Sequence, residues 1–283
     1  MARVVMRMLA SVPLPALHAL GALLGWLAYL ASPTYRRHLR QNMAQAGFTD
    51  SALRRAAIAS AGRMVAELPA IWMRPRGEVM RLVRSFDEQG LIAQARARGQ
   101  AIVFLTPHQG CFEITAQAIA ERLPLTAMYR PPKLAFLGPL TLEGRGKRNV
   151  RLAPADRSGV REMLAALKRG ESVGILPDQV PGEGEGEWAA FFGRPAYTMT
   201  LAMKLARRPD TVALLVFGER LPRGAGYAVH MRAMPDALPG ESDARRLNRA
   251  LEAQLRECPG QYLWGYNRYK RPRGAPPPPE AAA

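Results

Sequence analysis

From residue 83 onward, short apolar runs alternate with longer segments of helical periodicity. The expected strands are 83–86, 101–105, 125–129, 149–152, 172–176, 211–218 and 227–231, and the expected helices are 88–98, 114–123, 133–142, 158–169, 198–207 and 243–257. Strands and helices that alternate in this way form a mostly parallel sheet with helices on both faces. The sequence therefore predicts an α/β fold, and 283 residues, 48% of them hydrophobic, suffice for one large domain of this kind.

The stretch 12–31, near the N-terminus, is nearly free of charge. Twenty residues of helix span ~30 Å, which matches the hydrocarbon core of a bilayer. Arg3 and Arg7 precede this stretch, and the heavier basic cluster Arg36-Arg37-His38-Leu39-Arg40 follows it. Because basic residues stay on the cytoplasmic side, a membrane-anchor helix here would leave the main domain in the cytoplasm.

Other interpretations of this stretch remain open. A cleaved signal peptide is one, although no clean A-x-A site precedes the basic cluster, and a buried core helix is another. An anchor could span the bilayer or lie in its interface. We expect an anchor over 1–33, a main domain over 34–273 with a helical entry at 34–82 and an α/β core at 83–273, and a disordered proline-rich tail at 274–283.

The charge balance predicts an anionic partner. The chain has 40 Lys and Arg against 23 Asp and Glu, a net charge of +17. The basic residues are spread along the chain, and no helix-turn-helix, zinc-finger or RNA-recognition pattern accompanies them. We therefore expect a membrane surface or an acidic carrier as partner, and no nucleic acid.

The cysteines and histidines exclude two further classes. Cys111 and Cys258 do not make a disulfide framework. The 4 histidines are too scattered along the chain for a zinc site. We expect neither a metal nor another cofactor.

The candidate site begins at His108, between the expected strand 101–105 and the expected helix 114–123. Open α/β sheets carry their sites where strands end. Five residues of helix rotate by ~500°, so His108 and Glu113 would not share a face if both were helical. With His108 in the loop and Glu113 in the first helical turn, the loop can fold the imidazole onto the carboxylate, and a His held by an acid is a general base.

The pattern of a His, four residues and an acid after an apolar strand resembles the glycerolipid acyltransferases. With Glu as the acid and Gly110 two places after His108, it is similar to the late lauroyl/myristoyl acyltransferases of lipid A biosynthesis. Cys111 and Phe112 stand where that family usually has Asn and Trp. This departure leaves the His and the Glu intact and changes only the local packing.

Further blocks follow in the order of that family, from about residue 10 to 272. The resemblance implies that Arg130 stabilises an oxyanion, that Asp178 orients Arg130 or a substrate hydroxyl, and that Phe192 forms pocket wall. The residues expected to act are His108, Glu113 and Arg130 in catalysis, and in substrate binding Gly110, Asp178, Gln179, Phe192, Gly193, Arg268 and Lys270.

The resemblance implies transfer of a fatty acyl chain from acyl carrier protein, or from CoA, to a hydroxyl of a lipid A precursor. The enzyme would act at the cytoplasmic face of a bacterial inner membrane, and the basic surface suits an acidic carrier. A lysophospholipid, an ornithine lipid or another glycolipid is an alternative acceptor. A non-catalytic, basic, membrane-associated binding protein would explain the charge, but it would leave the ordered blocks as coincidence.

Cys111 raises the question of a covalent intermediate. It lies three residues from His108 near a helix start, where a thiolate is stabilised and a thioester could exchange onto it. Against this, the family usually carries Asn at this position, and Cys is often simply buried. We expect the acceptor hydroxyl to attack the thioester directly.

Overall fold

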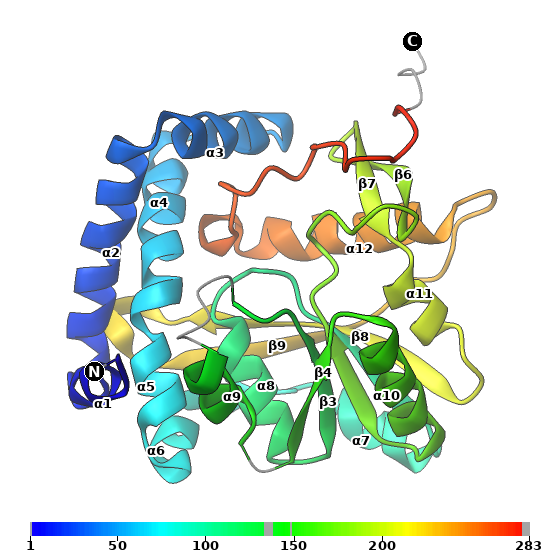
Figure 1. Cartoon of the computed structure of the whole chain (residues 1–283), viewed down its shortest axis with the longest axis horizontal. Helices are drawn as coiled ribbons and strands as arrows, with labels where there is room; N and C mark the ends of the chain where they lie inside the picture. The colour runs from blue at the N-terminus through cyan, green and yellow to red at the C-terminus, as the bar shows by residue number, and fades with distance from the viewer. Residues whose placement is uncertain (1, 133–137, 148, 279–283) are drawn as a thin grey trace.

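The computed structural model describes residues 2–132, 138–147 and 149–278, and it is built around one seven-stranded sheet (Figure 1). The spatial order is β1-β9-β8-β2-β5-β3-β4, and every neighbouring pair is parallel except β8 with β9. This confirms the predicted α/β fold. The strands are β1 Val83–Phe86, β2 Ala101–Leu105, β3 Leu125–Tyr129, β4 Val150–Pro154, β5 Ser172–Ile175, β8 Thr211–Arg220 and β9 Tyr227–Ala233.

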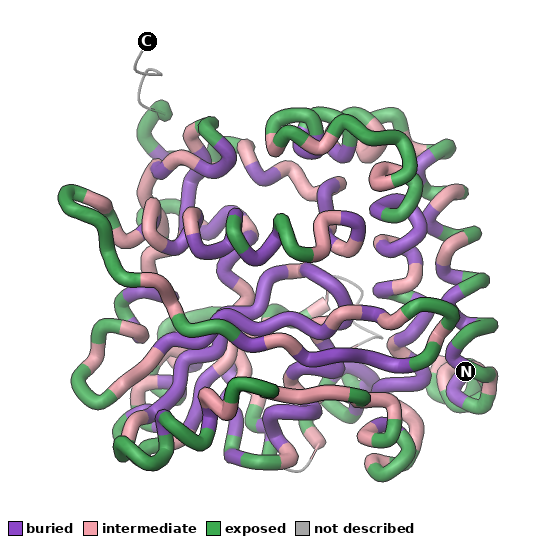
Figure 2. The backbone as a smooth tube through the Cα atoms, turned by 180° about the vertical axis from the view of Figure 1, so that it is seen from behind, coloured by how far each residue is buried: buried purple, intermediate pink, exposed green. Residues whose placement is uncertain are grey.

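Helices cover both faces of this sheet and extend beyond one of its edges (Figure 1). The helices are α1 Ala2–Ala10, α2 Leu14–Ala31, α3 Pro33–Gln45, α4 Ser51–Ala66, α5 Leu68–Met73, α6 Arg76–Arg81, α7 Leu91–Ala97, α8 Phe112–Ala120, α9 Gly138–Arg145, α10 Arg157–Lys168, α11 Leu201–Ala206 and α12 Asp243–Glu257, with short 3-10 turns at Pro222–Gly224 and Pro259–Gln261. Seen from behind, buried strands run through the middle and the exposed residues gather on the outer helices and loops (Figure 2).

The central strand β2 shows why the sheet forms here. All five of its residues are buried, and alternate side chains point to opposite faces. Ile102 and Phe104 pack with α7 and α8, whereas Val103 and Leu105 pack with α10, α11 and α12. A strand covered on both faces needs a continuous apolar run rather than an alternating one, which is the pattern that its sequence has.

Two parts of the chain need a closer description. Within the helical entry expected at 34–82, residues 51–73 form two helices, because the chain turns at Glu67 and restarts with Pro69 in the first turn of α5. The segment expected to be a helix from residue 198 begins inside an antiparallel hairpin, β6 Gly186–Phe191 and β7 Arg194–Met199. Trp188 and Tyr197 pair across the two strands with ring centroids 5.4 Å apart, a contact that no local pattern reveals.

Two other expectations are met only in part. Residues 133–137 of the expected helix 133–142 lie outside the described residues, and α9 covers Gly138–Arg145. The expected disordered tail begins as packed chain, because Ala275 is buried and the Trp188 Nε1 donates to the Pro276 carbonyl at 2.9 Å. Its last five residues, 279–283, are not among those described.

The apolar helix α2 packs along α4 rather than standing apart (Figure 1). In the described part of the chain it is the helix long and apolar enough to cross a membrane by length and composition, and 33% of it is buried. Gly21 and Gly25 face Gly62 so closely that a Cβ at any of the three would meet the backbone of the other helix. The G-x-x-x-G pattern of Gly21 and Gly25 therefore joins α2 to α4.

A buried ionic cluster fixes this helical layer to the sheet. Glu67, between α4 and α5, accepts hydrogen bonds from Arg220 at 2.6 and 2.8 Å and from the Tyr227 hydroxyl at 3.0 Å. His18 of α2 lies 3.2 Å from the same carboxylate. Burial alone raises the pKa of Glu67, but the Arg220 charge and the hydrogen bonds from His18 and Arg220 outweigh burial and lower this pKa to about 2.

This cluster makes a testable contribution to stability. Because the pKa of Glu67 in the folded chain, about 2, lies below its ordinary 4.5, its charge stabilises the fold fully above pH 4.5 and progressively less toward pH 2. Replacing Glu67 by Gln should lower the free energy of unfolding at pH 7 by about 3–5 kcal/mol, since it leaves Arg220 buried and unpaired. Urea denaturation of both chains from pH 7 to pH 3 should show this difference shrinking below pH 4.5.

The matched control is Glu171→Gln, which breaks a surface pair with Arg169 at 2.7 Å. An exposed pair contributes about 0–1 kcal/mol, so this variant should unfold almost as the parent does. Equal losses for the two variants, or a loss at Glu67 that does not depend on pH, would contradict the role given to the buried cluster.

Candidate active site

The candidate site lies where three adjacent parallel strands end. His108 follows β2, Asp178 and Gln179 follow β5, and Arg130 follows β3. Because β2, β5 and β3 are neighbours in that order and point the same way, their carboxyl ends meet at one edge of the sheet. This topology brings together residues that are up to 71 positions apart in the sequence.

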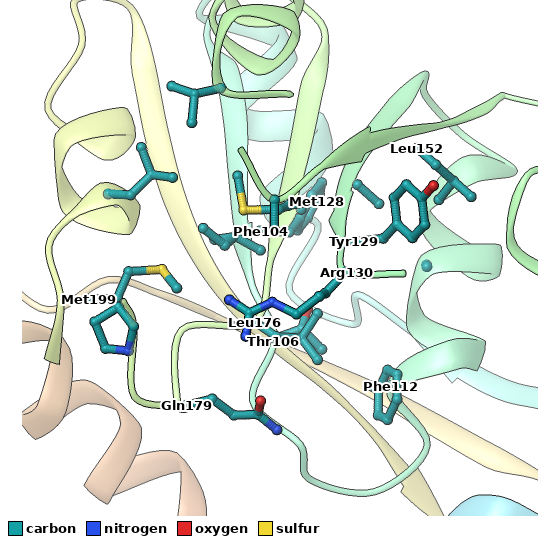
Figure 3. A pocket seen from close by; sticks show the side chains of 18 of the residues that line it. Phe104, Thr106, Phe112, Met128, Tyr129, Arg130, Leu152, Leu176, Gln179 and Met199 are labelled. Carbon is teal, nitrogen blue, oxygen red and sulfur yellow. The ribbon is translucent and has the colours of Figure 1, made fainter. Parts of the chain in front are cut away.

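A cavity of about 610 Å³ opens at this edge (Figure 3). Its polar lining includes His108, Glu113, Arg130, Arg145 and Gln179. Most of the remaining wall is apolar and includes Phe104, Ile119, Leu125, Ala127, Met128, Val150, Leu152, Val160, Leu176 and Met199. A hollow of this size with convergent polar groups at one part of its wall suits a ligand with a long apolar portion and a reactive polar end.

Asp178 holds the imidazole of His108. Its Oδ1 lies 2.9 Å from His108 Nδ1, and its Oδ2 accepts the backbone N–H of His108 at 2.9 Å. Asp178 is only 2% exposed. Burial by itself raises the pKa of Asp178, but the charge of His108 and its hydrogen bonds prevail and hold this pKa below the ordinary value, so the carboxylate is ionised.

The other ring nitrogen of His108 faces the cavity, which His108 lines. With Nδ1–H donated to Asp178, Nε2 carries a lone pair. The side-chain amide of Gln179 lies 3.2 Å from that Nε2. The ring of Phe112 meets the imidazole edge-on, with centroids 5.2 Å apart. His108 is thus fixed in one tautomer with its basic nitrogen toward the hollow.

Glu113 is not the partner of His108, which corrects the expected pairing. Its Oε1 accepts the Arg145 Nε–H at 2.8 Å, and its Oε2 accepts the Trp72 Nε1–H at 3.0 Å. Arg145 ends α9 and Trp72 belongs to α5, and these elements converge on the start of α8. The carboxylate therefore serves to fix a guanidinium that lines the cavity.

Arg130 reaches into the cavity from the end of β3. In Figure 3 its guanidinium extends toward Leu176 and Thr106. It makes no hydrogen bond or ion pair to any residue that the structure describes. The expected pairing of Asp178 with Arg130 is not formed, because Asp178 is committed to His108. Arg130 is free to meet a charge on a ligand.

Gly110 shapes the loop instead of lining the cavity. It has a φ of +61°, and a Cβ there would collide with the carbonyl of Gly218. Its N–H donates to the Gln261 carbonyl at 2.8 Å, and its own carbonyl accepts from Arg220 Nη2 at 2.7 Å. Both backbone groups of Gly110 are therefore used within the protein, and the buried cluster directly anchors the loop that carries His108.

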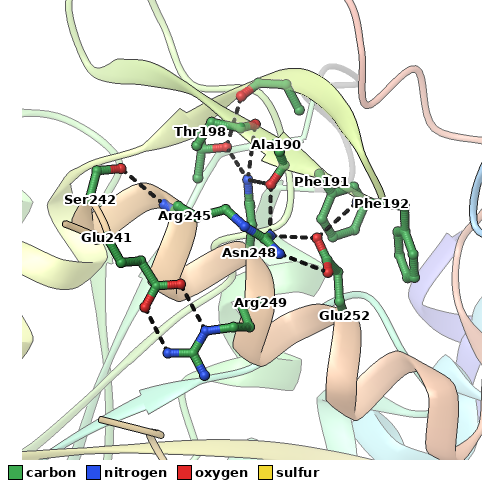
Figure 4. Close-up of polar contacts among 12 residues, drawn as sticks. Ala190, Phe191, Phe192, Thr198, Glu241, Ser242, Arg245, Asn248, Arg249 and Glu252 are labelled. Atoms are coloured by element: carbon green, nitrogen blue, oxygen red, sulfur yellow. Dashed lines mark hydrogen bonds and ion pairs between the residues drawn. The ribbon is translucent and has the colours of Figure 1, made fainter. Parts of the chain in front are cut away.

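The remaining expected substrate contacts lie outside the cavity lining. The Phe192 N–H donates to Glu252 of α12 at 2.8 Å, and Gly193 turns the β6–β7 hairpin with a φ of +77° (Figure 4). Arg268 is buried and donates to the Tyr197 carbonyl and to Thr198. These residues fasten the hairpin to the body of the domain. Lys270 is exposed with its Nζ 5.4 Å from the centre of a tyrosine ring.

Sequence reasoning missed Arg145 and Trp72. Arg145 lies in the last turn of α9, where basic residues are common. Trp72 lies in an apolar segment, where a tryptophan is expected to be a core residue. A Cβ at the neighbouring Gly144 would meet the ring of Trp72, but this contact appears only in the folded structure. Nothing in the spacing of Trp72, Glu113 and Arg145 marks them as one unit.

Comparison with known proteins identifies the family. The family model described as "Bacterial lipid A biosynthesis acyltransferase" matches residues 1–271. The chain is 27% identical over 221 residues to the lipid A biosynthesis palmitoleoyltransferase of Escherichia coli K12. The aligned residues make up 76% of this chain and 71% of that protein. The same organism's lipid A biosynthesis lauroyltransferase is 27% identical over 222 residues, 77% of this chain and 72% of that protein.

A third relative extends over more of the chain. A lipid A biosynthesis acyltransferase of Haemophilus influenzae is 24% identical over 276 residues, which cover 93% of this chain and 87% of that protein. The family match includes the loop of His108, the end of β5 and α9, so every side chain that lines the polar part of the cavity lies inside it. The chain therefore belongs to the bacterial lipid A biosynthesis acyltransferase family and is an acyltransferase.

Proposed function

We propose that this enzyme transfers a fatty acyl chain from a thioester donor to a hydroxyl of a lipid A precursor, with His108 as the general base. The observation that carries this proposal is the His108–Asp178 pair at the wall of a largely apolar cavity. An acyl transferase needs a base beside the reacting carbonyl and room for the hydrocarbon chain. The cavity offers both in one place.

The proton follows a short path. Nε2 of His108 takes the proton of the acceptor hydroxyl as that oxygen bonds to the thioester carbonyl carbon. Asp178 keeps the imidazole in the required tautomer and stabilises the imidazolium, as the carboxylate does in an Asp–His pair of a hydrolase. The carbon–sulfur bond then breaks, and the imidazolium returns the proton to the leaving thiolate. No atom of the enzyme is acylated.

The cations divide the negative charges between them. Arg130 has no partner among the described residues and reaches into the cavity, so we propose that it stabilises the oxyanion. Glu113 acts indirectly, as a positioning residue that holds Arg145. Arg145 then presents a fixed guanidinium to the same cavity, which suits an anionic acceptor. Gln179 contacts His108 and is placed to orient the hydroxyl.

The donor is proposed from charge. A net charge of +17 attracts an acidic acyl carrier protein over long range and at low salt. Acyl-CoA is the alternative thioester, and a lysophospholipid, an ornithine lipid or another glycolipid is an alternative acceptor. We place the reaction at the cytoplasmic face of a bacterial inner membrane. The aligned base and cavity favour an enzyme over a non-catalytic binding protein.

The first prediction of the proposed mechanism tests His108 as the base and Asp178 as the acid that orients it. His108→Ala and Asp178→Asn should each lower kcat by about 10²–10⁴, because proton transfer fails in one and the tautomer is wrong in the other. Acyl transfer is measured in detergent micelles, with circular dichroism and thermal melting as checks of folding. A folded Asp178→Asn enzyme with undiminished kcat would show that Asp178 does not orient the base.

The second prediction separates the two possible roles of Glu113. If Glu113 works through Arg145, then Glu113→Gln should lower kcat/KM strongly in the parent but only slightly in an Arg145→Met background. If Glu113 instead acts on His108, its loss should be just as damaging in either background. Trp72→Phe, which removes the other hydrogen bond to Glu113, is the control and should have an intermediate effect.

The third prediction concerns Cys111. Its thiol is 1% exposed, and burial together with the charge of Glu67 raises its pKa well above the ordinary value. It also does not line the cavity. We therefore expect Cys111→Ala to keep most of the activity and iodoacetamide to inactivate slowly. A radiolabelled acyl group trapped on Cys111, together with a dead Cys111→Ala enzyme, would overturn direct transfer.

A further inference from the structure

Helix α2 presents two different faces. The face toward the protein includes Leu14, Leu17, His18, Gly21, Gly25 and Tyr29. The opposite face carries a row that we call the leucine stripe, which consists of Leu20, Leu23, Leu24, Leu27 and Leu30, each 43–61% exposed. Their spacing places all five leucines along one side of the helix. The longest apolar helix of the described chain is therefore open on one side only.

The inner face cannot be released without loss. Gly21 and Gly25 lie against Gly62 at backbone distance, and His18 reaches the buried carboxylate of Glu67. Moving α2 into a bilayer on its own would break the glycine packing against α4 and remove His18 from the buried carboxylate of Glu67. Loss of a partner from a buried charge is strongly destabilising. Helix α2 must therefore move together with α4 or not at all.

Helix α4 cannot enter a bilayer. It carries Arg54, Arg55 and Arg63 within its 16 residues, and Glu67 follows it. An arginine near the bilayer centre is strongly unfavourable, because its charge loses its hydration. Because α2 and α4 lie side by side along their length (Figure 1), a spanning α2 would draw these charges into the hydrocarbon.

The surroundings of the leucine stripe match an anionic membrane surface. Among the residues that the structure describes, 11 large hydrophobic residues are exposed and eight of them belong to α1 and α2; the three on α1 are Val4, Val5 and Met8. Basic side chains flank the stripe at both ends, Arg7 on α1 and Arg37 and Arg40 on α3. Basic side chains near the membrane surface are attracted to an anionic leaflet. A helix with an apolar face between basic ends lies in the interface plane.

We propose that α1 and α2 form a monotopic docking face, with the leucine stripe inserted side-on into one leaflet and both ends of α2 on the same side of the membrane. This inference depends on the proposed membrane-borne acceptor, but not on which residues catalyse the transfer. Of the two placements left open for the anchor, spanning and interfacial, it selects the interfacial one, with a helix that remains part of the folded domain.

The topology can be measured directly. In a full-length Cys258→Ser chain, whose remaining Cys111 is buried, Ala2→Cys and Thr34→Cys place one thiol at each end of the docking face. A membrane-impermeant maleimide should label both in inverted inner-membrane vesicles and neither in intact spheroplasts. Labelling of Ala2→Cys in spheroplasts would mean that α2 spans the bilayer, and this would overturn the proposal.

The stripe itself is tested by charge. Leu23→Glu combined with Leu27→Glu should weaken binding to phosphatidylglycerol-containing vesicles about tenfold or more. Leu142→Glu with Leu238→Glu, two exposed leucines on other elements, is the matched control and should bind as the parent does. Unchanged vesicle binding of the Leu23→Glu, Leu27→Glu variant would overturn the proposal. It would also be overturned if the parent were a dimer in solution and this variant were a monomer.

Acyl transfer in detergent micelles separates this proposal from the proposed function. The Leu23→Glu, Leu27→Glu variant should keep its micellar activity, because neither leucine lines the cavity. Loss of vesicle binding with intact micellar transfer supports the docking face. A parent enzyme that docks but shows no transfer in micelles would instead contradict the proposed reaction alone.

Discussion

The buried pair of Glu67 and Arg220 connects parts of the chain that are otherwise independent. Arg220 ends β8, Glu67 joins α4 to α5, and His18 brings α2 to the same carboxylate. Arg220 also donates to the carbonyl of Gly110, two residues after His108. A buried charge pair tolerates little displacement, because separating the partners leaves each charge buried with neither an opposite charge nor water to solvate it. The helical layer and the loop that carries His108 are therefore fixed relative to each other.

The site uses the parallel sheet in the way such sheets allow. Strands β2 and β5 are neighbours with the same direction, so the loop after one delivers His108 and the loop after the other delivers Asp178. The Glu113–Arg145 pair approaches from helices outside the sheet. His108 and Arg145 are thus held by separate sets of contacts, and substitutions can separate their contributions. The apolar wall between the sheet and α8 leaves room for a hydrocarbon chain.

Helix α2 combines a role in folding with the proposed membrane docking. An apolar helix of this length is usually read as a detachable anchor. Here its glycines contact α4 and its His18 meets a buried carboxylate, so one face belongs to the core. Only the leucine stripe remains for lipid. In the proposed docking mode the same helix supports the loop of His108 from within and rests on a leaflet from outside.

The sequence by itself determined the sheet and the position of the site. The apolar runs became strands, with 101–105 and 125–129 matching β2 and β3 residue for residue, because burial on both faces demands a local pattern. It also placed His108, Arg130 and Gln179 at strand ends that line the cavity. Which side chains pair was decided only by tertiary structure. Asp178 meets His108 because β5 lies beside β2, and Arg145 and Trp72 take Glu113 because α9 and α5 converge on α8. Strand order and helix packing arise from contacts between distant segments, so the spacing of residues along the chain does not contain them.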